Sequence, residues 1–127
     1  MIYGIGTDIV SVERMRHNLE RFGDRFAERI LTDDELKEFR DVVNHAHFLA
    51  KRFAAKEAVA KAMGTGFING LSLRHIGVSH DALGKPVLKF SGRAEEFVRS
   101  EKIALSHISL ADETDYAVAF VTLSGEA

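Results

Sequence analysis

Alternating apolar and polar positions open the chain. Residues 2–10 have the period and composition of a β-strand, loosened by two glycines. The alternation places three small or acidic positions on one face: Gly4, Gly6 and Asp8. It places three bulkier positions on the other: Ile5, Thr7 and Ile9. Asp8 is therefore predicted to stand beside a bare stretch of backbone that another group can approach closely.

The period then lengthens to that of amphipathic helices. Ser11 is a candidate N-cap for a first helix, and Thr32–Glu35 has the capping-box spacing that begins a second helix, ending near Val43. The apolar stripe expected for the first helix is Val12, Met15, Leu19 and Phe22.

Alanine at every fourth position gives residues 46–63 the strongest helical signal in the chain. Gly64 is a natural stop for this helix. The repeat consists of Ala46, Ala50, Ala54, Ala58 and Ala62. Such a ladder of small side chains lets a neighbouring backbone or ligand come near the helix axis.

The second half returns mainly to strand patterns. Segments 73–79 and 86–90 predict a pair joined by a turn over 80–85, and Ser91 can cap a short helix through about Ser100. Segments 105–110 and 116–123 predict a final hairpin. Because helices and strands segregate instead of alternating, we expect an α+β fold with an antiparallel sheet, built as a single domain over residues 1–127.

Composition excludes several classes of function. The 127 residues contain no cysteine, which rules out disulfides, thiolate metal sites and cysteine nucleophiles. No segment approaches the roughly 20 apolar residues of a membrane span. The formal charge of −2 gives no general attraction to nucleic acid or anionic lipid. We therefore expect a cytoplasmic protein without membrane or nucleic-acid partners.

Familiar ligand motifs are incomplete. Gly4-Ile5-Gly6 lacks the third glycine of a dinucleotide fingerprint, and there is no Walker or zinc-protease motif. His45 and His47 fall in an expected loop without companions at metal-ligand spacing.

Four charged residues suit phosphate chemistry. Glu57 and Lys61 are four positions apart and share a helix face, which fits an ordinary salt bridge but also places both beside the alanine ladder. Asp8 and Glu57 could supply the carboxylates that Mg²⁺ prefers. Lys61 and Arg52 could contact phosphate oxygens.

Four short motifs, in matching order and spacing, resemble the bacterial holo-acyl-carrier-protein synthases, the small 4′-phosphopantetheinyl transferases. They are Gly4-Ile5-Gly6-Thr7-Asp8-Ile9-Val10, Arg52-Phe53-Ala54-Ala55-Lys56-Glu57-Ala58, Lys61-Ala62-Met63-Gly64-Thr65-Gly66 and Gly84-Lys85-Pro86. The resemblance covers essentially the whole chain. It implies the 4′-phosphopantetheinyl transferase fold, with a long alanine-rich helix packed on a small antiparallel sheet.

The resemblance also implies an activity: Mg²⁺-dependent transfer of 4′-phosphopantetheine from coenzyme A to a serine of apo-acyl carrier protein, in fatty acid biosynthesis. Asp8 and Glu57 match the metal ligands, and Lys61 matches a catalytic lysine near the phosphates. Arg52 matches a basic residue serving the 3′-phosphate of the nucleotide. The remaining coenzyme-binding matches are Gly64, Thr65, Gly66, Pro86 and His107.

Two chemical roles stay open. His107 begins a strand that the family places against the coenzyme, yet the second histidine of many members is replaced by Ala111-Asp112-Glu113, and simple packing remains an alternative. Asp34 and Glu35 are candidates for the general base, but capping is the competing role. A metal-bound water would need no dedicated base.

A partner surface is expected on the first helix. Arg14, Arg21 and Arg25 are spaced to share one face, which the resemblance makes the docking face for an acidic carrier protein. A neighbouring acidic stripe keeps an ordinary solvated face as an alternative: Glu13, Glu20, Asp24 and Glu28. The resemblance further implies a homotrimer with active sites between subunits. Other possible functions are a transferase for secondary-metabolite carriers, a non-catalytic coenzyme A-binding module and a structural protein.

Overall fold

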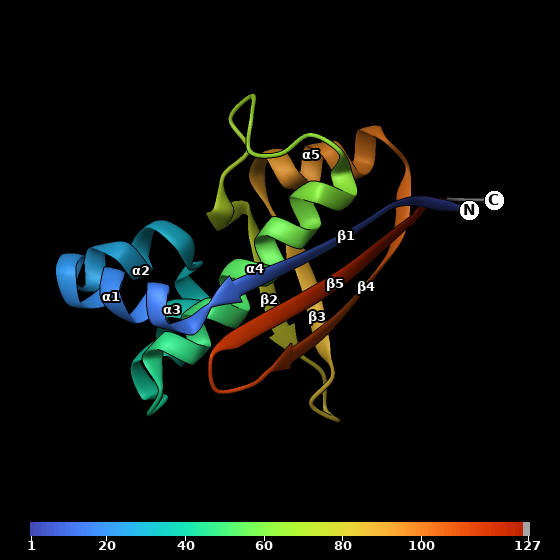
Figure 1. The fold of residues 1–127 in the computed structure, drawn as a ribbon. Helices are drawn as coiled ribbons and strands as arrows, with labels where there is room; N and C mark the ends of the chain where they lie inside the picture. The colour runs from blue at the N-terminus through green and yellow to red at the C-terminus, as the bar shows by residue number, and fades with distance from the viewer. Residues whose placement is uncertain (126–127) are drawn as a thin grey trace.

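A long central helix and a three-stranded sheet organise the computed structural model, which describes residues 1–125. Helix α4 (His45–Met63) packs against β1 (Ile2–Ser11) and β5 (Tyr116–Gly125), as Figure 1 shows. Strand β5 lies between β1 and β4 (Ile103–Asp112), and both pairings are antiparallel. The expected α+β fold, with an alanine-rich helix on a small antiparallel sheet, is confirmed.

The remaining elements surround α4. Three short helices gather beside its N-terminal half: α1 (Val12–Phe22), α2 (Asp24–Ile30) and α3 (Asp33–Asp41). A second, two-stranded sheet pairs β2 (Ile76–His80) with β3 (Pro86–Phe90). Helix α5 (Gly92–Ser100) follows and contacts β4. None of the described helices is both long enough and apolar enough to cross a bilayer.

Close packing of β1 on α4 explains the glycines of β1 and the alanines of α4. A Cβ atom added at Gly6 would lie 1.9 Å from the carbonyl oxygen of Ala58, and one at Gly4 would lie 1.9 Å from that of Ala62. The predicted close approach beside Asp8 is therefore real, and the approaching group is the backbone of α4. The alanine ladder of α4 and the glycine face of β1 therefore pack directly against each other.

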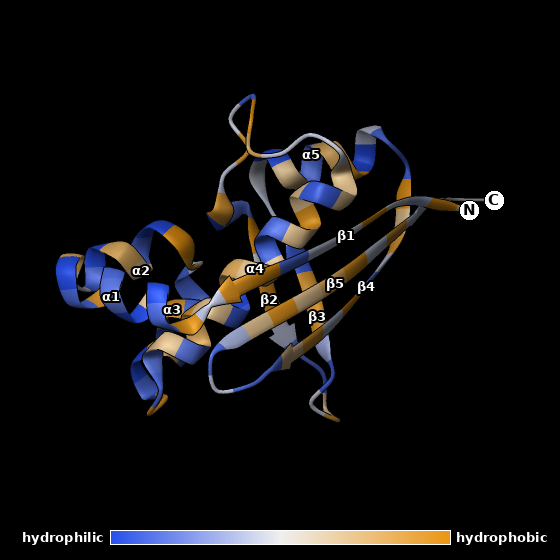
Figure 2. Ribbon diagram, in the orientation of Figure 1, coloured by the Kyte–Doolittle hydropathy of each residue, from blue (hydrophilic) through white to orange (hydrophobic). Residues whose placement is uncertain are grey.

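The opposite face of the three-stranded sheet is open and apolar. In β5 the residues of the inner face, such as Ala119 and Val121, are fully buried against α4, while their neighbours Val118 and Phe120 are exposed. Further exposed apolar residues on this open sheet face are Ile5, Ile9 and Leu105. In Figure 2 hydrophobic colour recurs along these strands. A monomer leaves this face in contact with water.

Several boundaries differ from the prediction. Gly23, with a φ of 67°, ends α1, so the expected single helix through Arg25 is wrong and Arg25 lies in α2. Residues Leu73–His75 form a 3₁₀ helix instead of the start of a strand, because Ser72 caps that turn with its hydroxyl group. His45 and His47 lie in the first turn of α4, capped by Asn44, and not in a loop.

The three predicted serine and threonine caps differ in outcome. The Ser11 side chain accepts the backbone N–H of Arg14 at 3.2 Å and caps α1 as predicted. Thr32 and Glu35 form the capping box: each side chain accepts the backbone N–H of the other, at 3.2 and 2.9 Å. Ser91 occupies the N-cap position of α5, but its side chain makes no capping hydrogen bond there.

Candidate active site

Strand β1 and helix α4 bring three of the predicted site residues together. Lys61 Nζ donates to Asp8 Oδ1 at 3.0 Å and to the carbonyl oxygen of Thr7 at 2.9 Å. Glu57 lies one turn before Lys61 on α4 and is close enough for the Asp8 charge to act on it. Within residues 1–125 the ion pair of Lys61 is with Asp8, so the salt bridge considered between Glu57 and Lys61 does not form.

The electrostatics of Glu57 favour a cation at this position. Burial raises the pKa of the Glu57 carboxyl group, and the neighbouring charge of Asp8 raises it further. The cations Lys61 and Arg14 act in the opposite direction. Two carboxylates therefore repel one another in a partly buried place, and a bound metal ion would relieve that repulsion. Arg14 reaches this site from α1, although the sequence predicted only a docking role for it.

The donor set suits a hard cation with an incomplete protein shell. Within the described part of the chain, no group of three or more His, Cys, Asp or Glu side chains is placed to hold a metal. Mg²⁺ is commonly bound by one or two carboxylates, with waters and substrate phosphates completing six ligands. Asp8 and Glu57 fit that pattern, and they would leave room for a phosphorylated ligand.

A separate basic hollow of about 460 Å³ contains Arg52 and Pro86. Its other basic side chains are Lys51, His80 and Lys85. Arg52 is only 3% exposed, and its Nε–H group has no hydrogen-bond partner. The Nη2 atom of Arg52 lies 3.4 Å from Glu38 Oε2. Asp112 also lines the hollow, 3.9 Å from Lys51 Nζ, but the four basic side chains leave an excess of positive charge that suits an anionic group such as a phosphate.

The carboxylate pair and the basic hollow lie on opposite sides of α4. Arg52 precedes Glu57 by five positions, which corresponds to about 140° around an α-helix. The sequence grouped Arg52 with Asp8, Glu57 and Lys61 as contacts for one ligand. Within a single chain the structure does not bring Arg52 to the other three.

The glycine loop after α4 forms as predicted. Gly64 ends the helix in the left-handed conformation, with a φ of 79°, and Gly66 also has a positive φ of 67°. Thr65 lies between them and lines a further hollow of about 230 Å³ shared with Phe97 of α5. The loop begins directly after the turn that carries Lys61, so it can border a ligand held there.

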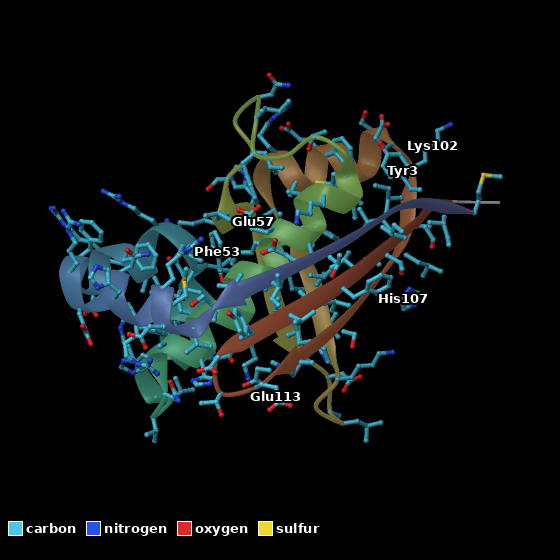
Figure 3. All side chains as sticks on the ribbon, in the orientation of Figure 1. Tyr3, Phe53, Glu57, Lys102, His107 and Glu113 are labelled. Carbon is cyan, nitrogen blue, oxygen red and sulfur yellow. The ribbon has the colours of Figure 1, made fainter. Side chains whose placement is uncertain are left out.

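His107 lies apart from both groups. It is an exposed residue of β4, paired in register with Thr122 and on the same side of the sheet as Ile5. Figure 3 shows it well away from Glu57 and Phe53 on α4. Any contact of His107 with a ligand at the carboxylate pair would have to come from another copy of the chain.

The three arginines of the expected docking face are all exposed, but they do not share one helix. Arg14 and Arg21 belong to α1, and Arg25 belongs to α2 beyond the break at Gly23. Glu13, from the neighbouring acidic stripe, pairs with Arg16 at 2.5 Å.

Sequence reasoning missed the burial of Lys56. Its side chain is fully buried and pairs with Glu35 at 2.7 Å. Glu35 does form the predicted cap, and its burial leaves it without access to a substrate proton, whereas Asp34 is exposed. The sequence did contain one signal for this burial: Lys56 lies in a helix whose neighbouring residues are mostly small or apolar and pack on several sides.

Comparison with known proteins gives concordant results. Residues 4–121 match the family model described as the 4′-phosphopantetheinyl transferase superfamily. The chain is 58% identical to the holo-[acyl-carrier-protein] synthase of Nitrosococcus oceani over 126 residues, covering 99% of this chain and 82% of that protein. The crystal structure of the Neisseria meningitidis holo-[acyl-carrier-protein] synthase matches with a TM-score of 0.93 and 48% identity, over 98% of this chain and 99% of that one.

A holo-(acyl-carrier-protein) synthase from Bacillus anthracis, solved in complex with CoA (3′,5′-ADP), matches with a TM-score of 0.83 and 37% identity. The match covers 99% of each chain.

Proposed function

The chain belongs to the 4′-phosphopantetheinyl transferase superfamily, among its holo-[acyl-carrier-protein] synthases, and on that premise we propose its reaction in detail. The enzyme transfers 4′-phosphopantetheine from coenzyme A to a serine of apo-acyl carrier protein, releases adenosine 3′,5′-bisphosphate and depends on Mg²⁺. The observation that carries the proposal is the meeting of Asp8, Glu57 and Lys61 where β1 packs on α4. The coenzyme complex of the Bacillus anthracis relative supports the choice of substrate.

Each residue of the carboxylate pair has a defined task in this reaction. Asp8 and Glu57 hold Mg²⁺, which when bound neutralises charge on the pyrophosphate of coenzyme A. Lys61 is half exposed and already positioned beside Asp8, so it can turn toward the phosphate oxygens and assist loss of the serine proton. Gly64, Thr65 and Gly66 border the coenzyme beyond the phosphates.

The basic hollow is the proposed site for the nucleotide end of coenzyme A. Arg52 lines the hollow together with Pro86 and contributes positive charge for the 3′-phosphate, while its guanidinium group also lies 3.6 Å from Glu35 and 3.4 Å from Glu38. Because this hollow and the carboxylate pair are on different sides of α4, we propose that the two groups act on the same coenzyme molecule only when they come from neighbouring chains. We therefore place each active site between two copies of the chain.

A homotrimer is the assembly we propose, as the resemblance implies. The open sheet face supplies apolar surface for it, including Ile9, Val118 and Phe120. Since His107 lies on that same face, assembly is also what would bring it to a neighbouring coenzyme site. In a closed ring of three subunits every interface is head-to-tail, so each subunit contributes two different surfaces, one to each neighbour.

Phe120→Glu should disrupt this assembly. Burying a new carboxylate in an apolar interface is costly, so we expect the variant to be a folded monomer with transfer lowered about a hundredfold or more. Light scattering after size exclusion gives the mass, and circular dichroism reports the fold. Lys102→Glu, at an exposed turn, is the control and should remain trimeric. A wild-type protein that is monomeric and fully active at assay concentration would contradict the proposal.

The carrier partner is proposed to dock near α1 and α2. Arg14 and Arg21 lie on the helix that borders Glu57, and Arg25 extends the exposed basic surface into α2. An acidic acyl carrier protein fits such a surface.

We further propose a role in fatty acid biosynthesis, a cytoplasmic location and a single transferase domain over residues 1–127. The absence of cysteine suits a reducing compartment, and the family match over residues 4–121 supports one domain.

A direct assay tests the function. The purified protein is mixed with coenzyme A, Mg²⁺ and apo-acyl carrier protein, and the carrier is then weighed by mass spectrometry. We expect the mass to increase by one phosphopantetheinyl group, and we expect no increase when a chelator removes the metal. Bound coenzyme A without any change in carrier mass would instead indicate a non-catalytic coenzyme A-binding module.

A further inference from the structure

Lys56 is a lysine whose three ammonium hydrogens are all used inside the protein. The side chain is 0% exposed. Its Nζ atom donates to Glu35 Oε1 at 2.7 Å, to the carbonyl oxygen of Leu73 at 3.1 Å and to that of Ile76. Burial lowers the pKa of Lys56, whereas the Glu35 carboxylate opposes that shift. No substrate can reach this group, so Lys56 has no direct part in the transfer.

Glu35 makes an equally complete set of contacts. It is 1% exposed, and Oε1 also accepts the backbone N–H of Thr32 at the start of α3. Its Oε2 atom accepts the backbone N–H of Val78 in β2 at 2.9 Å and lies 3.6 Å from Arg52 Nε. The pair thus connects α3, α4 and β2 through directional bonds. We call Glu35 and Lys56 the buried ion pair.

Stability alone does not explain such a pair. A buried ion pair contributes little compared with apolar residues of the same volume, because both charges must lose their hydration. Its directional bonds can, however, select one arrangement of the elements that it joins. The question is which arrangement matters here.

The position of Lys56 in α4 answers that question. Lys56 directly precedes Glu57, and α4 meets β1 through glycine and alanine, a contact of close but non-directional packing. The buried ion pair supplies directional bonds on another side of the same helical turn. It therefore resists rotation or sliding of α4, which would move the Glu57 carboxylate relative to Asp8. A metal site needs its ligands held to about 0.5 Å.

We propose that Lys56, held by Glu35, is a positioning residue that sets the rotation of α4 so that Glu57 and Asp8 can bind one cation together. The inference deepens the proposed function and rests on it. It concerns the geometry of the carboxylate pair and not the chemistry of the transfer.

The test uses a double variant that removes both charges without leaving either one unpaired. Glu35→Gln with Lys56→Met keeps an oxygen for the cap of α3 and similar side-chain volumes, but the backbone N–H of Val78 and the carbonyl groups of Leu73 and Ile76 lose their side-chain partners. We therefore expect a folded protein with a lower melting temperature than wild type. We expect its Mg²⁺ dissociation constant, measured by titration calorimetry with coenzyme A present, to rise at least about tenfold. The KM for apo-carrier should stay within about twofold, because the docking helices do not move.

A matched control removes an exposed ion pair. Glu95→Gln with Arg99→Met neutralises an i,i+4 pair on α5, with its charged groups 3.3 Å apart, and should leave Mg²⁺ affinity unchanged. Glu35→Asp is the second test variant, to be used if the double variant does not fold. It keeps the charge but withdraws the carboxylate by one methylene, and we expect a smaller loss of Mg²⁺ affinity in the same direction.

The outcomes separate the two proposals. A folded double variant, or a folded Glu35→Asp variant, with wild-type Mg²⁺ affinity would overturn the positioning role while leaving the transferase function intact. A wild-type protein that neither binds Mg²⁺ with coenzyme A nor modifies the carrier would instead refute the function on which this inference rests.

Discussion

Asp8→Asn and Glu57→Gln will each lower kcat/KM for apo-carrier by at least about a thousandfold. The physical reason is the loss of one of the two carboxylates proposed to hold the cation, and within residues 1–125 no group of three or more His, Cys, Asp or Glu side chains is placed to hold a metal. Metal ions supply several kcal/mol of charge stabilisation in such transfers. A thousandfold corresponds to about 4 kcal/mol. Initial rates of carrier modification, measured by mass spectrometry across a range of Mg²⁺ concentrations, give the values.

These two substitutions should not unfold the protein. The pKa of Glu57 is raised because the folded state disfavours its charged form, so the metal-free Glu57→Gln variant should be at least as stable as wild type at neutral pH. Glu95→Gln removes an exposed carboxylate from α5, outside the proposed site, and should keep transfer within a few-fold of wild type. Full activity in either Asp8→Asn or Glu57→Gln would refute the metal assignment.

Gly6→Ala will destabilise the protein by about 3 kcal/mol or more. The added methyl group would lie 1.9 Å from the carbonyl oxygen of Ala58, and that atom belongs to the hydrogen-bonded backbone of α4 and cannot move alone. The strand must separate from the helix, which opens the core and displaces Asp8. Urea unfolding of the purified variant, or its failure to accumulate as folded protein, provides the measurement.

Gly77→Ala is the matched comparison in another strand. Its methyl group would lie 3.2 Å from the side-chain methyl carbon of Thr32, an atom that can shift by a few tenths of an ångström. We expect a loss of about 1 kcal/mol or less there. Equal stability losses at Gly6 and Gly77 would argue against the close contact of β1 with α4 as the special feature of this fold.

Local patterns predicted much of this fold. The alternation in β1 and the alanine ladder of α4 are repeats within one element, so their buried faces could be assigned before the partner was known. Contacts between residues far apart in the sequence could not be predicted from such repeats. The buried Lys56 donates hydrogen bonds to Glu35 and to the carbonyl groups of residues 73 and 76. No local pattern predicts partners so distant in sequence.

The site shows the same division. Asp8 and Glu57 are 49 positions apart, and only the family resemblance predicted that they would meet. The separation of Arg52 from Glu57 was within reach of sequence reasoning, because five residues of an α-helix turn a side chain to the far side. The break at Gly23 was also available as a helix-ending glycine, and overlooking it placed Arg25 on the wrong helix.

A mixing experiment tests most directly whether each active site combines the two halves from different subunits. One variant, Asp8→Asn, loses the carboxylate pair, and a second, Lys51→Glu with Lys85→Glu, makes the basic hollow repel a phosphate. Each variant alone should be nearly inactive in carrier modification.

Co-assembled in equal amounts, the two variants form some interfaces that join an intact carboxylate pair from one chain to an intact hollow from its neighbour. Random assembly makes about a quarter of the interfaces complete, so we predict carrier modification at about a quarter of the wild-type rate. Mixed assemblies, verified by two affinity tags, that remain as inactive as either variant alone would contradict a site shared between subunits.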